Sequence, residues 1–338
     1  MNVRRRLIRT TAAAGAVTIG LATLAGCPPT GSALGRSEDG RLAVVASFYP
    51  MEFLVKTIGG RHVSVSDLTE PGVEPHDLEI SPRQTAELSD AGLVVYLKGL
   101  QPAVDEAVKV AEVRNKVDAA ALTELESHGT SSGHDHGGEH SHEGHEHGGG
   151  DSHAEEGHEH SGEDAAADPH IWLDPVRYAE VASGVGKALE KADPDHAADY
   201  SRNTDALVAR LGRLDKAFKD GLANRTTNTF ITTHSAFGYL AERYGLHQEG
   251  ISGLDPESEP SPARMKELQT IAEEEKVGTV FFETIASDRT ARTLAGDTGL
   301  HTDVLDPVEG ITDTSQGRDY IQVMQANLRN LQKALAAT

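Results

Sequence analysis

The chain of 338 residues contains a single cysteine, Cys27, so neither an internal disulfide nor a zinc cluster built from cysteines can form. Aromatic residues are scarce, with one Trp, seven Tyr and seven Phe, whereas a cleft for an organic solute is expected to use many of them. Neither an H-E-x-x-H sequence nor a pair of C-x-x-C sequences occurs. The signatures of metalloproteases and of zinc fingers are therefore missing.

Basic residues are also fewer than acidic ones. Lys and Arg total 31 against 53 Asp and Glu, which gives a formal net charge of −22. Such a chain repels nucleic acid and anionic membranes and attracts cations. We therefore expect no nucleic-acid partner and a ligand that is cationic or neutral. The length leaves room for two modest lobes, each with a core of its own.

The N-terminus has the features of an export segment. Arginines among residues 4–9 are followed by an apolar, alanine-rich stretch from Thr10 to Gly26, which is too short for a comfortable membrane span. The run Leu24-Ala25-Gly26-Cys27 resembles the lipobox of bacterial lipoproteins, in which the cysteine becomes the lipid-bearing N-terminus. We predict a signal peptide over 1–26, a lipid-anchored linker over 27–40 and a location on the outer face of the cytoplasmic membrane. Export could use the general or the twin-arginine route.

From Arg41 onward, short apolar runs alternate with helical patterns. This β-α-β rhythm predicts an α/β fold with parallel sheets. An N-terminal lobe is expected over 41–193 and a C-terminal lobe over 223–338, with a long connecting helix over 194–222 that carries leucines at helical spacing. The expected strands are 42–48, 63–68, 93–97, 116–120, 229–233, 248–252, 278–282 and 302–305, and the expected helices are 51–58, 82–90, 102–113, 235–244, 261–275, 288–298 and 320–335.

A histidine-rich insert interrupts the N-terminal lobe at residues 127–167. Its composition of Gly, Ser, Asp and Glu cannot build a packed core, so we expect it to be disordered without metal. Imidazole suits zinc, copper and nickel better than calcium or magnesium. We predict an auxiliary loop that binds several ions weakly through ten histidines, namely His128, His134, His136, His140, His142, His145, His147, His153, His158 and His160.

Three other histidines lie in loops at or near the carboxyl ends of expected strands, where open α/β sheets bind ligands. His76 and His170 are flanked by prolines, which restrict the backbone, and His234 follows a strand directly. We predict that these three imidazoles bind one metal ion. Asp306 is the preferred fourth ligand, with Glu283 or water as the alternatives. The remaining histidines, at 62, 196, 247 and 301, are assigned to surface or capping positions.

Four segments taken together resemble the zinc and manganese solute-binding lipoproteins of ABC importers. The resemblance implies two α/β lobes bridged by a rigid helix, with a metal ion held in the cleft between them, and it matches His76, His170, His234 and Asp306 to ligand positions. The four segments are Gly72-Val73-Glu74-Pro75-His76-Asp77-Leu78-Glu79, Asp168-Pro169-His170-Ile171-Trp172-Leu173-Asp174-Pro175, Thr233-His234-Ser235-Ala236-Phe237-Gly238-Tyr239-Leu240 and Leu305-Asp306-Pro307.

Within that family the manganese proteins tend to offer a carboxylate where this chain has His234, so zinc is preferred over manganese. The resemblance implies a monomer that captures Zn²⁺ and delivers it to an ABC permease and its ATPase. An adhesin or a zinc-buffering lipoprotein, or manganese import, remain alternatives. We do not expect an enzyme, because nothing organises Glu74, Asp77 or Glu283 as a catalytic set for a zinc hydrolase.

Overall fold

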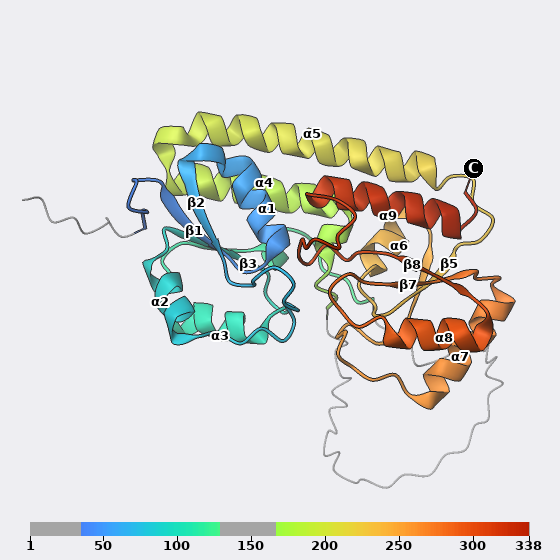
Figure 1. Cartoon of the computed structure of the whole chain (residues 1–338). Coiled ribbons are helices and arrows are strands. Elements are labelled where there is room, and N and C mark those ends of the chain that lie inside the picture. Colours follow the sequence, from blue (N-terminus) through green and yellow to red (C-terminus); the bar gives the residue numbers. More distant parts are fainter. Residues whose placement is uncertain (1–34, 129–166, 338) are drawn as a thin grey trace, which may run out of the picture. The chain divides into compact units, whose positions relative to one another are not determined.

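The computed structural model describes residues 35–128 and 167–337. Within these ranges two parallel four-stranded sheets form, and both are covered by helices (Figure 1). The predicted α/β class with two parallel-sheet lobes is therefore confirmed. Cys27 and nine of the ten insert histidines lie outside the described ranges, as does the predicted signal peptide. No helix of the described part is long and apolar enough to cross a membrane.

The sheet of the first lobe has the strand order β2-β1-β3-β4. Its central strand β3 is buried along its whole length, and β1 nearly so, as parallel strands with helices on both faces should be. Crossover helices connect the strands. The elements are β1 (Leu42–Ala46), α1 (Tyr49–Gly59), β2 (Val63–Asp67), α2 (Pro82–Asp90), β3 (Leu93–Tyr96), α3 (Pro102–Val110) and β4 (Lys116–Asp118).

The second sheet repeats this topology with the order β6-β5-β7-β8, and all its pairs are parallel. The equivalent order places the carboxyl ends of β1 and β5 at the same point of each sheet. The elements are β5 (Thr229–Thr232), α6 (Gly238–Tyr244), β6 (His247–Gly250), α7 (Pro262–Glu274), β7 (Thr279–Phe282), α8 (Arg289–Thr298), β8 (His301–Val304) and α9 (Tyr320–Ala334).

Local sequence explains where several helices begin. Ser81 caps α2 in a capping box with Gln84, and Ser261 caps α7 by accepting a hydrogen bond from the Arg264 backbone N–H. Both helices have proline at their first position, where no backbone N–H is needed. The starts predicted from Ser81 and Ser261 are confirmed.

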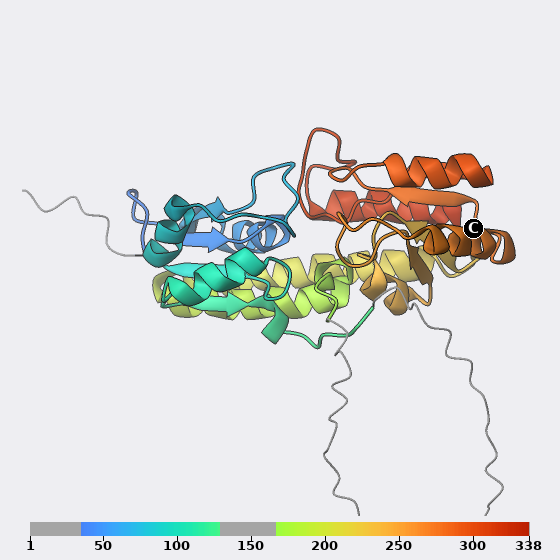
Figure 2. The same cartoon turned by 90° about the horizontal axis from the view of Figure 1, so that it is seen from below.

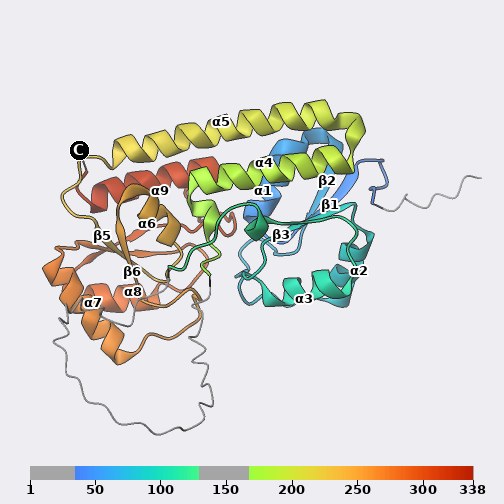
Figure 3. The same ribbon diagram turned by 180° about the vertical axis from the view of Figure 1, so that it is seen from behind.

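The connection between the lobes is longer than predicted. Two helices, α4 (Pro175–Ala192) and α5 (Ala197–Gly221), pack along each other, and α5 contacts α1 of the first lobe and α9 of the second (Figures 1 and 3). The sequence analysis identified the second of these helices and missed α4. The signals for α4 were readable, because Asp174 accepts the capping hydrogen bond from Val176 and Pro175 occupies the first turn.

Aromatic packing joins the two lobes into one core. The Trp172 ring lies 5.0 Å from Phe48 in the first lobe, and its Nε1 donates a 2.7 Å hydrogen bond to the carbonyl of Pro307 in the second. Tyr320 of α9 donates to the carbonyl of Trp172 at 2.6 Å. The segment around Trp172 is therefore fixed to both lobes.

Loops from the two lobes also meet. A Cβ built on Gly72, in the loop after β2, would lie 3.7 Å from the Thr312 methyl in the loop before α9. Figure 2 shows these two loops side by side between the sheets. Residues at the ends of strands from different lobes can therefore share one site.

Candidate metal centre

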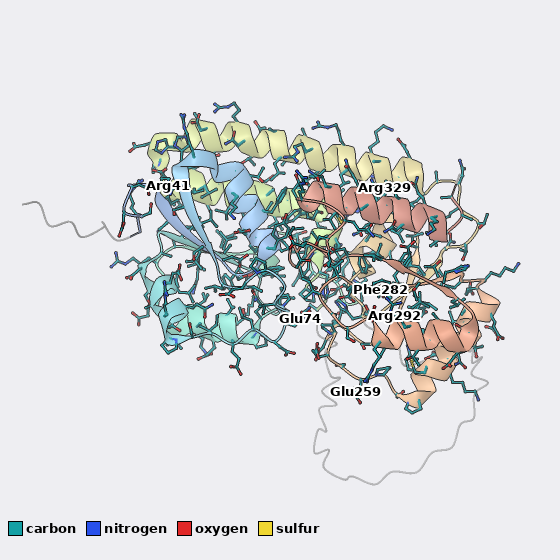
Figure 4. The ribbon with its side chains drawn as sticks, viewed as in Figure 1. Arg41, Glu74, Glu259, Phe282, Arg292 and Arg329 are labelled. Atoms are coloured by element: carbon teal, nitrogen blue, oxygen red, sulfur yellow. The ribbon has the colours of Figure 1, made fainter. Side chains whose placement is uncertain are left out.

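His76 enters the site from the loop after β2. A hydrogen bond from the backbone N–H of Val73 to the carbonyl of Glu70 closes a turn there, and Gly72 has a φ of +83°, a conformation that a residue with a Cβ rarely adopts. The Glu74 carboxylate then accepts a hydrogen bond from the backbone N–H of His76 at 3.2 Å. Figure 4 shows Glu74 among the loops between the lobes. The loop is thus held in shape from within.

His170 lies in the segment that ends the insert, and its ring is fully buried. Asp168 fixes this ring, because one carboxylate oxygen contacts both the backbone N–H at 2.9 Å and the Nδ1 of His170 at 2.7 Å. Nδ1 therefore carries the proton toward Asp168, which leaves Nε2 free to accept a metal ion.

His234 follows β5 and is buried as completely as His170. Its Nδ1 lies 2.6 Å from an oxygen of Glu283, the residue after β7, and the hydroxyl of Thr233 donates to the same oxygen. Glu283 thus orients His234 in the way that Asp168 orients His170. In each case a carboxylate holds the ring nitrogen that faces away from the site, as in most protein metal centres.

Glu309 enters from the loop after β8. Asp306 shapes this loop by accepting hydrogen bonds from the backbone N–H of Val308 at 2.7 Å and from the hydroxyl of Thr284 at 2.9 Å. Val308 has a φ of +60°, which is unfavourable for a β-branched residue. The strained residue directly precedes Glu309, so the loop conformation serves to direct this side chain inward.

The four side chains converge on one point. The Nε2 atoms of His170, His76 and His234 lie 3.4, 3.6 and 3.8 Å from one oxygen of Glu309. The three ring centroids are 5.3 to 6.0 Å apart. Within residues 35–128 and 167–337, all three Nε2 atoms and both Glu309 oxygens are buried without a hydrogen-bond partner. Buried polar atoms are almost always paired, so this cluster has the composition of a site that binds a cation.

The pKa shifts of the groups in and around the cluster also indicate a cation-binding site. Burial alone would lower the pKa of the His170 imidazole, but its contacts with Asp168 and Glu309 raise it to about 9. Burial would raise the pKa of Glu309, yet the nearby imidazoles hold it well below its usual range. Burial together with the charge of Glu309 raises the pKa of Glu74 to about 9. Without a metal ion, a proton on His170 thus balances the Glu309 carboxylate.

Three imidazole nitrogens and one carboxylate oxygen suit zinc in tetrahedral geometry, since zinc accepts both ligand types and manganese favours more oxygens. The ligand atoms all lie within 4.8 Å of one another, which is compatible with bonds of about 2 Å to a shared ion. In that geometry the four side chains would supply all four ligands of the ion.

The structure brings together His76, His170 and His234, which the sequence analysis placed in one site. Asp306, the preferred fourth ligand, is absent from the group, because its carboxylate oxygens bind Thr284 and Val308 instead. Glu283 faces the far nitrogen of His234. The carboxylate that does join the three imidazoles, Glu309, was missed, although it lies only a few residues beyond the same strand.

The other histidines of the folded lobes lie apart from this cluster. His247 and His301 are exposed at the first residues of β6 and β8. His62 and His196 stack on each other with ring centroids 3.8 Å apart and contact Asp199 and Asp193. His128, the first histidine of the insert, lies beside Glu126 and Glu242 in a second group.

Comparison with known proteins gives long matches. The zinc-binding lipoprotein AdcA of Streptococcus pneumoniae serotype 4 is 34% identical over 310 residues, covering 88% of this chain and 56% of AdcA. The chain thus spans little more than half the length of that relative. The high-affinity zinc uptake system protein ZnuA of Bacillus subtilis is 37% identical over 302 residues, covering 88% of this chain and 89% of that protein.

A solved structure agrees with these matches. The Zn(II)-bound ZnuA-like domain of Streptococcus pneumoniae AdcA superposes with a TM-score of 0.68 and 31% identity, covering 88% of this chain and 99% of that domain. The family model described as zinc-uptake complex component A, periplasmic, matches residues 44–334. Since this match takes in both lobes and all four clustered side chains, the chain belongs to the family of periplasmic A components of zinc-uptake complexes.

Proposed function

We propose that this protein captures Zn²⁺ outside the cytoplasm and delivers it to an ABC permease and its ATPase. The observation that carries the proposal is the convergence of the half-buried His76 with the buried His170, His234 and Glu309. Their facing atoms have no hydrogen-bond partner among the residues that the structure describes. Zinc is the cargo, and these four residues are its proposed ligands. Membership in a zinc-uptake family supports the choice of metal.

The ligands come from both lobes, so binding and release involve the junction between them. His76 follows a strand of the first sheet, whereas His234 and Glu309 follow strands of the second. A docked permease would open the cluster by displacing the loop that contains Gly72 or the loop that contains Thr312. In this role the protein binds and hands over an ion without chemical change, which is our reason for proposing no enzymatic activity.

Zinc binding is tested by native mass spectrometry of the full-length chain in the presence of a competing chelator. We expect one tightly held Zn²⁺, and a weaker response to Mn²⁺. His234→Asn should remove tight binding, whereas His301→Asn, which changes an exposed histidine on β8, should leave it intact. Equal loss in both variants, or tight binding retained in His234→Asn, would show that another site holds the ion.

We also propose that Cys27 carries a lipid that anchors the protein to the outer face of the cytoplasmic membrane, with residues 1–26 removed. The relative from Streptococcus pneumoniae is named a lipoprotein, which supports this proposal. Cells that express the full chain in medium with labelled palmitate should label it, and Cys27→Ser should abolish the label. A labelled Cys27→Ser protein would contradict the proposal.

A further inference from the structure

The loop that carries Glu309 begins where the second sheet ends. Strands β7 and β8 pair as far as Phe282 and Val304, and the N–H of Leu305 still donates to the carbonyl of Phe282 at 3.0 Å. Asp306 follows and is buried. Its backbone N–H and carbonyl lie beyond the strand pairing, and buried backbone groups are almost always hydrogen-bonded. They therefore need partners from another element.

Asn327 of α9 supplies both partners. Its Oδ1 accepts a hydrogen bond from the backbone N–H of Asp306 at 3.0 Å, and its Nδ2 donates to the carbonyl of Asp306 at 2.7 Å. Only 1% of Asn327 is exposed. A primary amide carries an acceptor and a donor in one plane, so it can take the place of a neighbouring strand here. Asn327 thus fixes the start of the loop to α9.

Trp172 holds the next residue of the same loop. Its indole is fully buried, and Nε1 donates a hydrogen bond to the carbonyl of Pro307 at 2.7 Å. Trp172 also follows His170 closely, within the short 3-10 helix Ile171–Leu173. The hydrogen bond therefore joins the segment that carries one proposed ligand to the loop that carries another.

One side of α9 supports both segments. Tyr320, at the start of this helix, donates to the carbonyl of Trp172 at 2.6 Å. Asn327 lies about two turns further along α9, so its side chain points the same way as that of Tyr320. Both side chains are buried. The two ligand-bearing segments are thus held by a single rigid element.

The loop depends on this support because its conformation is unfavourable. Val308, between Pro307 and Glu309, has a φ of +60°, which a β-branched residue adopts only where the surrounding contacts impose it. The contacts of Asn327 and Trp172 fix the two residues directly before Val308. Without them the loop would relax to an ordinary backbone conformation, and the carboxylate of Glu309 would turn away from the imidazoles.

We propose that Asn327 and Trp172 are positioning residues of the metal centre, which hold the strained loop so that the Glu309 carboxylate completes the ligand set. The inference rests on the proposed function, because it takes Glu309 as a ligand of the ion. Neither side chain belongs to the group of ligand atoms, so both act through Glu309.

A double-mutant cycle on the full-length chain tests this proposal, with zinc affinity measured by competition with a chelator. Asn327→Leu replaces the amide with an apolar side chain of similar shape, and Trp172→Phe removes the Nε1 donor but keeps an aromatic ring. Each change should weaken zinc binding by about tenfold. In a Glu309→Gln background the same changes should have little further effect, because they act through Glu309.

Cobalt(II) provides a readout that a loss of stability alone does not change. Bound in place of zinc, Co²⁺ absorbs visible light strongly with four ligands and weakly with five or six, so its spectrum reports the coordination geometry. Asn327→Leu and Trp172→Phe should each shift the Co²⁺ spectrum of the parent chain toward that of Glu309→Gln.

Asn330→Leu is the matched control. Asn330 lies on α9 close to Asn327, and its Nδ2 donates to the carbonyl of Val304 at 2.8 Å and to Gln316 at 2.9 Å. The change removes buried amide contacts from the same helix but leaves Asp306 and Pro307 held. We expect the parent's zinc affinity and the parent's Co²⁺ spectrum.

Parent-like affinity and spectra in Asn327→Leu and Trp172→Phe would overturn the proposal, as would losses that persist undiminished in the Glu309→Gln background. If Asn327→Leu does not fold, Trp172→Phe completes the same cycle. Unchanged zinc affinity in Glu309→Gln alone would refute the proposed ligand and this inference with it, and that result is distinct from a failure of the two positioning residues.

Discussion

Single residues in and beside the metal centre have distinct roles, as two carboxylates three positions apart show. Asp306 and Glu309 are both buried and both follow β8. The Asp306 oxygens accept hydrogen bonds from Thr284 and from the backbone of Val308. The Glu309 oxygens face three imidazoles and have no hydrogen-bond partner in the part of the chain that the structure describes. Asp306 therefore shapes the loop, and Glu309 is the proposed ligand.

This division predicts unequal effects of two conservative changes. Glu309→Gln should weaken zinc binding by about 10- to 100-fold, because a neutral amide replaces the charged ligand. Asp306→Asn retains the size of the side chain and one acceptor oxygen, so its effect should be smaller than that of Glu309→Gln. Competition with a chelator of known zinc affinity measures both. A greater loss of zinc affinity in Asp306→Asn than in Glu309→Gln would indicate that Asp306 is the fourth ligand.

Zinc binding should release a proton at neutral pH. Because its pKa is raised to about 9, the His170 imidazole is positively charged, with protons on both ring nitrogens, in the metal-free protein at neutral pH. An imidazole must be neutral to bind zinc. Protons compete with zinc for this imidazole. The apparent zinc affinity should therefore decrease steadily as the pH falls below about 9. Calorimetry at about pH 7.5 in buffers with different ionisation enthalpies should report roughly one proton released. Proton release near zero would contradict the protonated state of His170.

At the scale of helices and strands, close packing of α4 on α5 depends on glycine. A Cβ on Gly186 of α4 would lie 2.2 Å from the hydroxyl oxygen and 3.0 Å from the methyl carbon of Thr204 on α5. Gly186→Ala should therefore lower the free energy of unfolding by about 1–3 kcal/mol despite its better helix propensity. A Cβ on Gly212 of α5 would have no described atom within 4 Å, so Gly212→Ala should raise the free energy of unfolding by about 0.5–1 kcal/mol. Urea unfolding measures both, and equal signs would contradict the packing argument.

The junction between α4 and α5 depends on one buried carboxylate. Asp193 accepts hydrogen bonds from Tyr200 and Arg36 at 2.7 and 2.8 Å, and His196 lies 2.7 Å away. Burial would raise the pKa of Asp193, but these three contacts lower it to about 2. Because the folded-state pKa lies below the unfolded value, the ionised carboxylate stabilises the fold above about pH 4. This stabilisation is lost as the pH falls toward 2.

Asp193→Asn should therefore be less stable than the parent chain at neutral pH by about 1–3 kcal/mol. The difference should shrink as the pH is lowered from about 4 to 2, where the parent carboxylate becomes protonated. Chemical denaturation at several pH values measures this difference. Asp195→Asn, at an exposed neighbouring position, should follow the parent at every pH. A constant difference between Asp193→Asn and the parent would show that ionisation of Asp193 does not stabilise the junction.

At the scale of the whole molecule, the insert and the lobes should be separable in their metal binding. A chain without residues 129–160 should bind fewer zinc ions and retain one tight site, because the proposed ligands of the cluster lie outside that segment. Zinc at about 100 times its dissociation constant should raise the free energy of unfolding by about 2.7 kcal/mol in both forms. Native mass spectrometry and thermal unfolding test this pair of expectations. Loss of tight binding in the shortened chain would show that the ligands of the tight site lie in the insert.

The sequence by itself determined the fold class, most helix and strand positions, and the association of His76, His170 and His234. Apolar periodicity and capping residues are local, and the carboxyl ends of parallel strands are where ligands gather, so these features can be read without coordinates. The omission of α4 was a failure to use local signals, because Asp174 and Pro175 mark its start.

Tertiary structure alone decided which carboxylate faces the imidazoles. Asp306, Glu283 and Glu309 all follow strands of one sheet, and their residue types suit a ligand equally well. Only the folded structure shows that Asp306 is hydrogen-bonded to Thr284 and Val308 and that Glu283 contacts His234. Among the described residues, Glu309 has no hydrogen-bond partner. The contacts of Thr284 with Asp306 and of His234 with Glu283 join residues 22 and 49 positions apart, so they cannot be read from a local pattern along the chain.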